Sequence, residues 1–136
     1  MANGKGGQSA PGLRVLVVED NPDAAESLAL VLRAYGDDVR IAADGPAALA
    51  LAQAEAPDAM LLNLGLPGMD GYEVARRLRQ LPLPKRPLLV AVSGYGGAQD
   101  LIRCREAGID LHFVKPANPA ELQAVLRKLQ ELPGGG

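Results

Sequence analysis

The stretch LRVLVVEDNP, residues 13–22, decides the fold class of this chain of 136 residues. Leu13–Val18 is a short apolar run rich in β-branched residues, which is typical of a strand buried on both faces. Glu19 and Asp20 end the run, and Asn21-Pro22 then opens a helix with an N-cap and a proline in its first turn. A buried strand that passes directly into a capped helix indicates a parallel α/β sheet.

The same alternation of strand and helix continues along the chain. We expect strands at residues 13–18, 38–41, 59–62, 88–92 and 111–114. We expect helices at residues 22–35, 47–54, 72–80, 99–107 and from residue 119 onward. Short connections imply right-handed crossovers and a doubly wound α/β fold with a five-stranded parallel sheet. We expect the order 2-1-3-4-5, one of the two common orders in such sheets. One domain would span residues 13–132, between flexible tails at 1–12 and 133–136.

The composition excludes several classes of function. The net charge is −2, so no large basic field is available to hold nucleic acid or an anionic membrane, and we expect neither as a partner. The single cysteine, Cys104, excludes an internal disulfide and agrees with a reducing cytoplasm. No apolar run approaches the ~20 residues of a membrane-spanning helix. We therefore expect a cytoplasmic protein.

Polar side chains stand where the predicted strands end, and parallel strands bring such positions to one edge of the sheet. These are Glu19, Asp20, Asn63, Ser93 and Lys115. Two carboxylates and a side-chain oxygen suit Mg²⁺, whereas a lysine and a hydroxyl suit phosphoryl oxygens. Each residue alone also has a structural explanation, as a turn, a cap or a surface charge. Their joint occurrence at four strand ends favours a site for phosphoryl chemistry.

Four motifs in this order resemble those of the response-regulator receiver family, the CheY-like domains of two-component signalling. They are VLVVEDN (15–21), LPGMDGYE (66–73), AVSGYG (91–96) and HFVKP (112–116). The resemblance covers about residues 13–132 and implies the flavodoxin-like, CheY-like fold. The GYG and HxVKP endings resemble those of receivers attached to hybrid histidine kinases.

The resemblance also implies a role for each site residue. Glu19, Asp20 and residue 63 would hold Mg²⁺, and Lys115 would pair with the phosphoryl group. Ser93 would be the switch hydroxyl, and His112 stands where the family often has an aromatic switch residue. His112 has a second interpretation as a partly buried ring without a special role. Such a domain would be a signalling module rather than an enzyme. Its upstream partner would be a histidine kinase or a histidine phosphotransfer protein.

The chain departs from the family at the central position. The phosphoacceptor of the family is an aspartate four residues before the loop proline, and counting back from Pro67 gives Asn63. A neutral carboxamide has no oxygen comparable to the nucleophilic carboxylate, so normal phosphorylation should be blocked. Asn63 retains a carbonyl oxygen for a cation but brings one negative charge fewer, so the affinity for Mg²⁺ should fall.

Three functional hypotheses remain open at this point. The first is a receiver of ordinary lineage, made for phosphorylation-dependent partner binding, whose acceptor has been removed. The second is a pseudo-receiver that binds partners independently of phosphorylation, through the last two helices and the fifth strand. The third is a flavodoxin-like cofactor-binding protein or small α/β enzyme. Aromatic residues make up only 3% of the chain, and no hydroxyl-rich phosphate loop follows the first strand, so a flavin is disfavoured.

Overall fold

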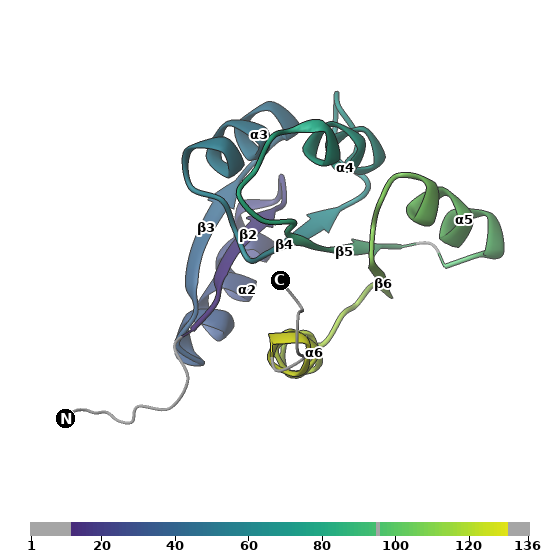
Figure 1. The fold of residues 1–136 in the computed structure, drawn as a ribbon. Coiled ribbons are helices and arrows are strands. Elements are labelled where there is room, and N and C mark those ends of the chain that lie inside the picture. The colour runs from purple at the N-terminus through teal and green to yellow at the C-terminus, as the bar shows by residue number, and fades with distance from the viewer. Residues whose placement is uncertain (1–11, 95, 131–136) are drawn as a thin grey trace.

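The computed structural model describes residues 12–94 and 96–130. Its five parallel strands form one sheet in the order β3-β2-β4-β5-β6 (Figure 1). The strands are β2 (Arg14–Val18), β3 (Asp38–Ala42), β4 (Ala59–Asn63), β5 (Leu88–Ser93) and β6 (Leu111–Val114). The second strand of the chain lies at one edge and the fifth at the other, which confirms the predicted order 2-1-3-4-5.

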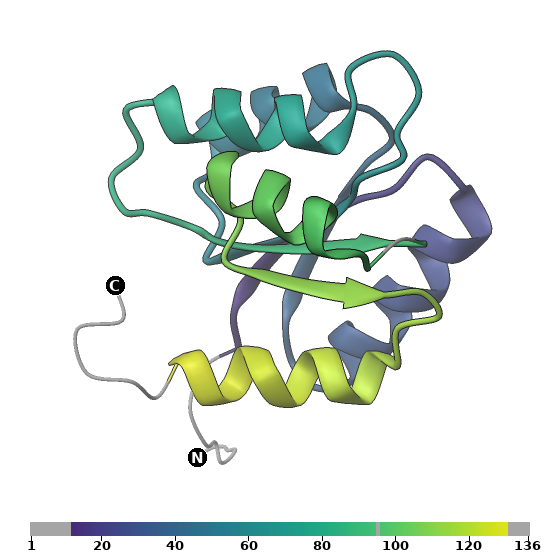
Figure 2. The same cartoon turned by 90° about the vertical axis from the view of Figure 1, so that its right-hand side faces the viewer.

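Helices cover both faces of the sheet. They are α2 (Pro22–Ala34), α3 (Gly45–Ala54), α4 (Gly71–Gln80), α5 (Ala98–Glu106) and α6 (Pro119–Gln130). Figures 1 and 2 show α3, α4 and α5 on one face, and α2 and α6 on the other. Because helices cover both faces at the centre of the sheet, the central strands β2 and β4 are almost wholly buried, and the aliphatic core forms two layers.

Several element boundaries differ by one or two residues from those predicted. Helix α3 begins at Gly45, because the Oδ1 atom of Asp44 accepts a hydrogen bond from the backbone N–H of Ala47 at 2.8 Å and caps the helix there. Pro46 is therefore inside the first turn, where its missing N–H costs nothing. Strand β5 extends to Ser93, one residue further than predicted.

The predicted tails fall mostly on residues 1–11 and 131–136, which lie outside the described residues. Gly12 is described, and its backbone lies directly against the turn that follows α2. A Cβ atom at Gly12 would stand only 1.9 Å from the carbonyl oxygen of Gly36, so any side chain there would force the two segments apart. Among the helices of residues 12–94 and 96–130, none has the length and apolar character needed to cross a bilayer.

The buried carboxylate of Asp37 joins α6 to the segment that enters β2. The Oδ1 atom of Asp37 accepts from the backbone N–H of Leu13 at 3.0 Å, and its Oδ2 atom accepts from the side-chain amide of Gln123. Arg127 adds a hydrogen bond from Nη2 to the carbonyl of Tyr35 at 2.7 Å. The Leu13 N–H and the Gln123 amide thus give the buried carboxyl group its hydrogen-bond partners, as burial of a charge requires.

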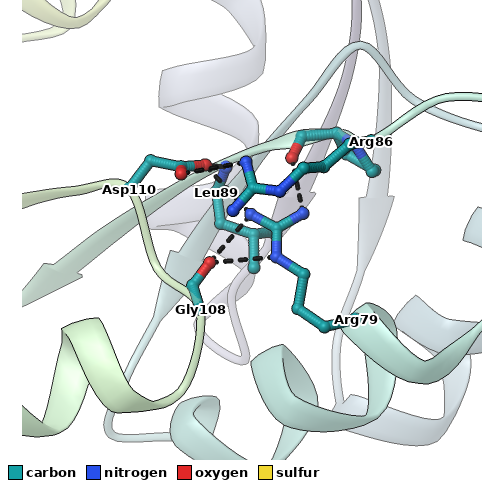
Figure 3. Close-up of polar contacts among 6 residues, drawn as sticks. Arg79, Arg86, Leu89, Gly108 and Asp110 are labelled. Carbon is teal, nitrogen blue, oxygen red and sulfur yellow. Dashed lines mark hydrogen bonds and ion pairs between the residues drawn. The ribbon is translucent and has the colours of Figure 1, made fainter.

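Arg79 joins α4 to the segments that precede β5 and β6 (Figure 3). The guanidinium of Arg79 donates from Nε and Nη2 to the carbonyl of Gly108, at 3.0 and 2.8 Å, and from Nη1 to that of Pro87 at 2.8 Å. Asp110 contacts both Arg79 and Arg86 and also accepts from the backbone N–H of Leu89. The last turn of α4 is thereby joined to the starts of both strands.

Candidate functional site

The carboxyl edge of the sheet brings four of the predicted site residues together. Glu19 and Asp20 follow β2, Asn63 is the last residue of β4, and Lys115 follows β6. Strands β2 and β4 are neighbours, with Val18 opposite Leu62, so the acidic pair and Asn63 face one another across the gap. The site therefore lies where the strand order reverses, the usual ligand position in such sheets.

Asn63 is the centre of this group, and its side chain uses every hydrogen bond that it can make. Its Nδ2 atom donates to Oε2 of Glu19 at 3.2 Å and to Oδ1 of Asp20 at 3.3 Å. Its Oδ1 atom accepts from Nζ of Lys115 at 3.2 Å and from the backbone N–H of Gly65 at 3.0 Å. An amide has two N–H donors and two acceptor lone pairs, so no capacity is left over.

The neighbours determine which way the amide points. With the amide turned over, its oxygen would face two carboxylates and its NH₂ group would face an ammonium and a backbone N–H. All four contacts would then pair like with like. The observed orientation is the one in which each donor meets an acceptor, so it follows from the chemistry of the surroundings.

The charges of the site are only partly balanced. Nζ of Lys115 lies 3.9 Å from Oε1 of Glu19, and the Lys115 side chain is 43% exposed against 15% for Glu19. Two carboxylates and one ammonium give the group a net charge of −1, whereas an aspartate at position 63 would give −2. The N–H dipoles of Asn63 supply some of the positive potential that the acidic pair lacks.

The donor set does not fit a divalent cation in this arrangement. We expected the carbonyl oxygen of Asn63 to face a cation together with Glu19 and Asp20, but this oxygen points to Lys115 and Gly65 instead. In the described part of the chain, no three or more His, Cys, Asp or Glu side chains are grouped so that they could hold a metal ion. Glu19 and Asp20 remain as carboxylate ligands of the kind that Mg²⁺ prefers, but each already accepts a hydrogen bond from the Asn63 amide.

Ser93 and His112 form a second polar pair on the neighbouring strands. The hydroxyl oxygen of Ser93 lies 2.8 Å from Nε2 of His112, within hydrogen-bond distance. Ser93 is buried, and His112 on β6 is half-buried. The two residues for which the sequence predicted a switch role are thus in direct contact.

Two clefts reach the site from opposite faces of the sheet. One, of about 750 Å³, lies between the loops that follow β4 and β5 and is lined by Asn63, Ser93 and Lys115, together with Tyr72 and Arg103. The other, of about 520 Å³, is mostly apolar, lies between α2 and α6, and also touches Asn63 and Lys115. A molecule that entered the first cleft would meet the Asn63 side chain directly.

The first cleft contains residues that the sequence did not point to. The guanidinium carbon of Arg103 lies 3.9 Å from the centre of the Tyr72 ring, a cation–π contact at the wall of the cleft. Burial raises the pKa of the Tyr72 hydroxyl and also that of the neighbouring Cys104 thiol, so both stay protonated near neutral pH. No local pattern marks Arg103, because its partner is about a quarter of the chain away.

Comparisons with known proteins agree with this arrangement. The family model described as the response regulator receiver domain matches residues 15–127. The DNA-binding response regulator MtrA of Mycolicibacterium smegmatis is 39% identical over 115 residues, which are 84% of this chain and 49% of that protein. The chain thus spans about half the length of this curated relative.

Solved structures give the same result. The chemotaxis protein CheY4 of Vibrio cholerae matches with a TM-score of 0.81 and 27% identity, covering 88% of this chain and 98% of that one. The receiver domain of a sensor histidine kinase from Pseudomonas aeruginosa PAO1 matches with a TM-score of 0.78 and 33% identity, covering 86% and 96%. That structure has a magnesium ion coordinated in its active site cleft.

Proposed function

Because this chain belongs to the response regulator receiver domain family, we propose that it is a two-component receiver that accepts no phosphoryl group at residue 63. The observation that supports this proposal most directly is the side chain of Asn63. It stands at the end of β4 where the resemblance expects the acceptor, and its amide is fully engaged with four neighbours.

The chemistry of position 63 explains why phosphorylation should stop there. Attack on phosphorus needs a nucleophilic oxygen with available electron density, and an ionised carboxylate supplies it. The Asn63 oxygen belongs to a neutral amide and already accepts from Lys115 and Gly65. In an Asn63→Asp variant, Lys115 would neutralise the bound phosphoryl group and Ser93 would hydrogen-bond to it.

Receiver domains interact with histidine kinases or histidine phosphotransfer proteins, and we propose such a protein as the upstream partner. The downstream partner is proposed to be another protein. Some relatives are described as DNA-binding regulators, and this chain spans about half of their length. The expectation that the present domain makes no nucleic-acid contact of its own therefore stays a prediction. So does the cytoplasmic location.

Restoring the acceptor tests this proposal. Purified wild-type protein and an Asn63→Asp variant are incubated with acetyl phosphate and Mg²⁺, and intact-mass spectrometry measures phosphoryl incorporation. We expect one phosphoryl group on the variant and none on the wild type. An additional Lys115→Ala substitution should reduce incorporation into the variant. Failure of Asn63→Asp to react would show that the remaining pocket is not competent, and labelling of the wild type would show that Asn63 is no block.

A second candidate is constitutive partner binding, favoured by apolar side chains exposed on α5 and β6. Leu101 and Ile102 on α5 are 48% and 57% exposed, and Val114 on β6 is 49% exposed. Large exposed apolar groups near one another are typical of protein-binding surfaces. This candidate predicts that beryllofluoride and Mg²⁺ leave the hydrogen-exchange rates over residues 98–114 unchanged in both wild type and Asn63→Asp. A blocked switch instead predicts that only the variant changes when beryllofluoride and Mg²⁺ are added.

A further inference from the structure

We propose that the Asn63 amide takes the place of a divalent cation, so that the acidic pair is held without metal and Mg²⁺ does not bind in the millimolar range. This inference rests on the proposed function, because it concerns the same residue that blocks phosphorylation. It goes further in assigning to Asn63 a positive contribution, the internal cross-link of the pocket. It also goes beyond a loss of one negative charge, which alone would only weaken metal binding.

The first step of the argument is the position of the NH₂ group. It lies between Glu19 and Asp20, 3.2 and 3.3 Å from one oxygen of each. Carboxylates held close together repel, and a receiver with an aspartate at this position brings a third carboxylate to them. Two N–H donors that point at two ionised acceptors make charge-assisted hydrogen bonds and offset that repulsion. The amide thus offsets the repulsion between two carboxylates, as a cation would offset the repulsion among three.

The second step is the cost of admitting a cation between the acids. The amide would have to turn over so that its oxygen became a ligand. This movement breaks both hydrogen bonds to the acids and removes the acceptor of Lys115 and of the Gly65 N–H. It also places an NH₂ group against two other donors. The rearrangement loses four good contacts before the cation gains its ligand.

The third step concerns binding from the outer side with the amide left in place, which the contacts of Glu19 disfavour. Oε2 of Glu19 also accepts from the backbone N–H of Asn21 at 3.0 Å, so that oxygen is shared already. Its Oε1 atom lies 3.9 Å from the Lys115 ammonium, which repels a metal ion. With both oxygens of Glu19 engaged, Asp20 would be left as the main carboxylate to displace water from a hydrated Mg²⁺, an ion that gives up its water reluctantly.

Thermal unfolding with and without Mg²⁺ tests the inference, and no phosphodonor is present. A ligand that binds the native state alone raises the melting temperature, and the stabilisation grows with the logarithm of one plus the ratio of ligand concentration to Kd. We expect the wild type to melt at the same temperature in EDTA and in millimolar Mg²⁺. The melting temperature of Asn63→Asp should rise with the logarithm of the Mg²⁺ concentration once that concentration exceeds Kd. Affinities from the titrations should differ by roughly tenfold or more.

Two further variants separate the cross-link from a simple effect of charge. Asn118→Asp adds the same negative charge at an exposed helix cap and should show no response to Mg²⁺. Asn63→Ala leaves the acids without their donors, so it should melt below the wild type in EDTA. If Asn63→Ala does not fold, the side-chain NH₂ resonances of Asn63 in the ¹⁵N-labelled wild type give the answer. We expect them to be unchanged by Mg²⁺.

Mg²⁺ stabilisation of the wild type equal to that of Asn63→Asp, or Mg²⁺-dependent shifts of the Asn63 amide resonances, would overturn the inference. An Asn63→Ala variant as stable as the wild type in EDTA would overturn the cross-link. These readouts are independent of phosphorylation: Asn63→Asp can bind Mg²⁺ and still fail to accept a phosphoryl group. In that case the proposed function fails and the present inference stands.

Discussion

Ser93 and His112 are joined by a hydrogen bond of 2.8 Å between the hydroxyl oxygen and Nε2, which links the last residue of β5 to the second residue of β6. The buried Ser93 hydroxyl is therefore held both by its own strand and by His112 on the neighbouring strand. Any movement of Ser93 toward the Asn63 side of the cleft must therefore stretch or replace its contact with the imidazole.

A double-mutant cycle should measure this contact. Ser93→Ala and His112→Phe each remove one partner, and we expect a coupling free energy of about 0.5–1.5 kcal/mol in urea unfolding, the usual range for one hydrogen bond. The Phe substitution keeps a ring at position 112, so packing is largely preserved. Additive effects of the two substitutions would show that the pair contributes nothing to stability.

Removal of the Asp37 carboxylate should be strongly destabilising. Asp37→Ala leaves the Leu13 N–H and the Gln123 amide without their buried acceptor, and we expect a loss of about 2–4 kcal/mol of unfolding free energy. Asp38→Ala is the matched control, because Asp38 is 57% exposed and its ion pair with Arg40 lies on the surface. That control should cost less than about 1 kcal/mol in the same urea titration.

The planar fork of Arg79 should be irreplaceable by lysine. Arg79→Lys keeps the positive charge but cannot contact Gly108, Pro87 and Asp110 together, so we expect a loss of roughly 2–3 kcal/mol (Figure 3). Arg77→Lys on the same helix provides the comparison, since Arg77 is 55% exposed and pairs only with Glu73 among the contacts described. Equal chemical-denaturation midpoints for the two variants would contradict the structural role of Arg79.

Asp58 should make stability depend on pH. Burial alone would raise the pKa of this carboxyl, but the hydrogen bond from the Arg14 N–H and the Lys85 ammonium outweigh burial and lower it. A lowered pKa in the folded state contributes stability above the unfolded value of about 4, and that stability is lost as pH falls through the folded pKa. The stability difference between wild type and Asp58→Asn should therefore be larger at neutral pH than near pH 3. Glu106→Gln, on exposed α5, serves as the control.

Much of the fold was predictable from local pattern. Leu13–Val18 with Asn21-Pro22 marks a strand and a capped helix, and repetition of that unit predicts the parallel sheet. Its strand order was expected as one of the two common orders for such sheets. The gathering of Glu19, Asp20, Asn63 and Lys115 followed from the same topology, because parallel strands end at one edge. The residues that follow each predicted strand can thus be assigned to one edge of the sheet from the sequence alone.

Other features depend on partners far away in sequence, and these were not predictable. Asp37 and Gln123 are 86 positions apart, and Arg79 and Gly108 are 29 apart, so no local spacing marks either pair. The direction of the Asn63 amide was also missed. Residue type alone allows its oxygen to face a cation, and only the joint placement of Lys115 and the Gly65 N–H shows that it faces away.

The turn formed by Tyr35, Gly36 and Asp37 contacts both the residue that precedes Leu13 and the last described helix, α6. Gly12 lies against Gly36, and Arg127 donates to the carbonyl of Tyr35. Tension applied between residues 12 and 127 would therefore load one corner of the molecule and leave the sheet edge with Asn63 outside the line of force. For the same reason, a circular permutant should keep its topology if a linker joins α6 to the segment before β2 and the chain is opened in a distant surface loop.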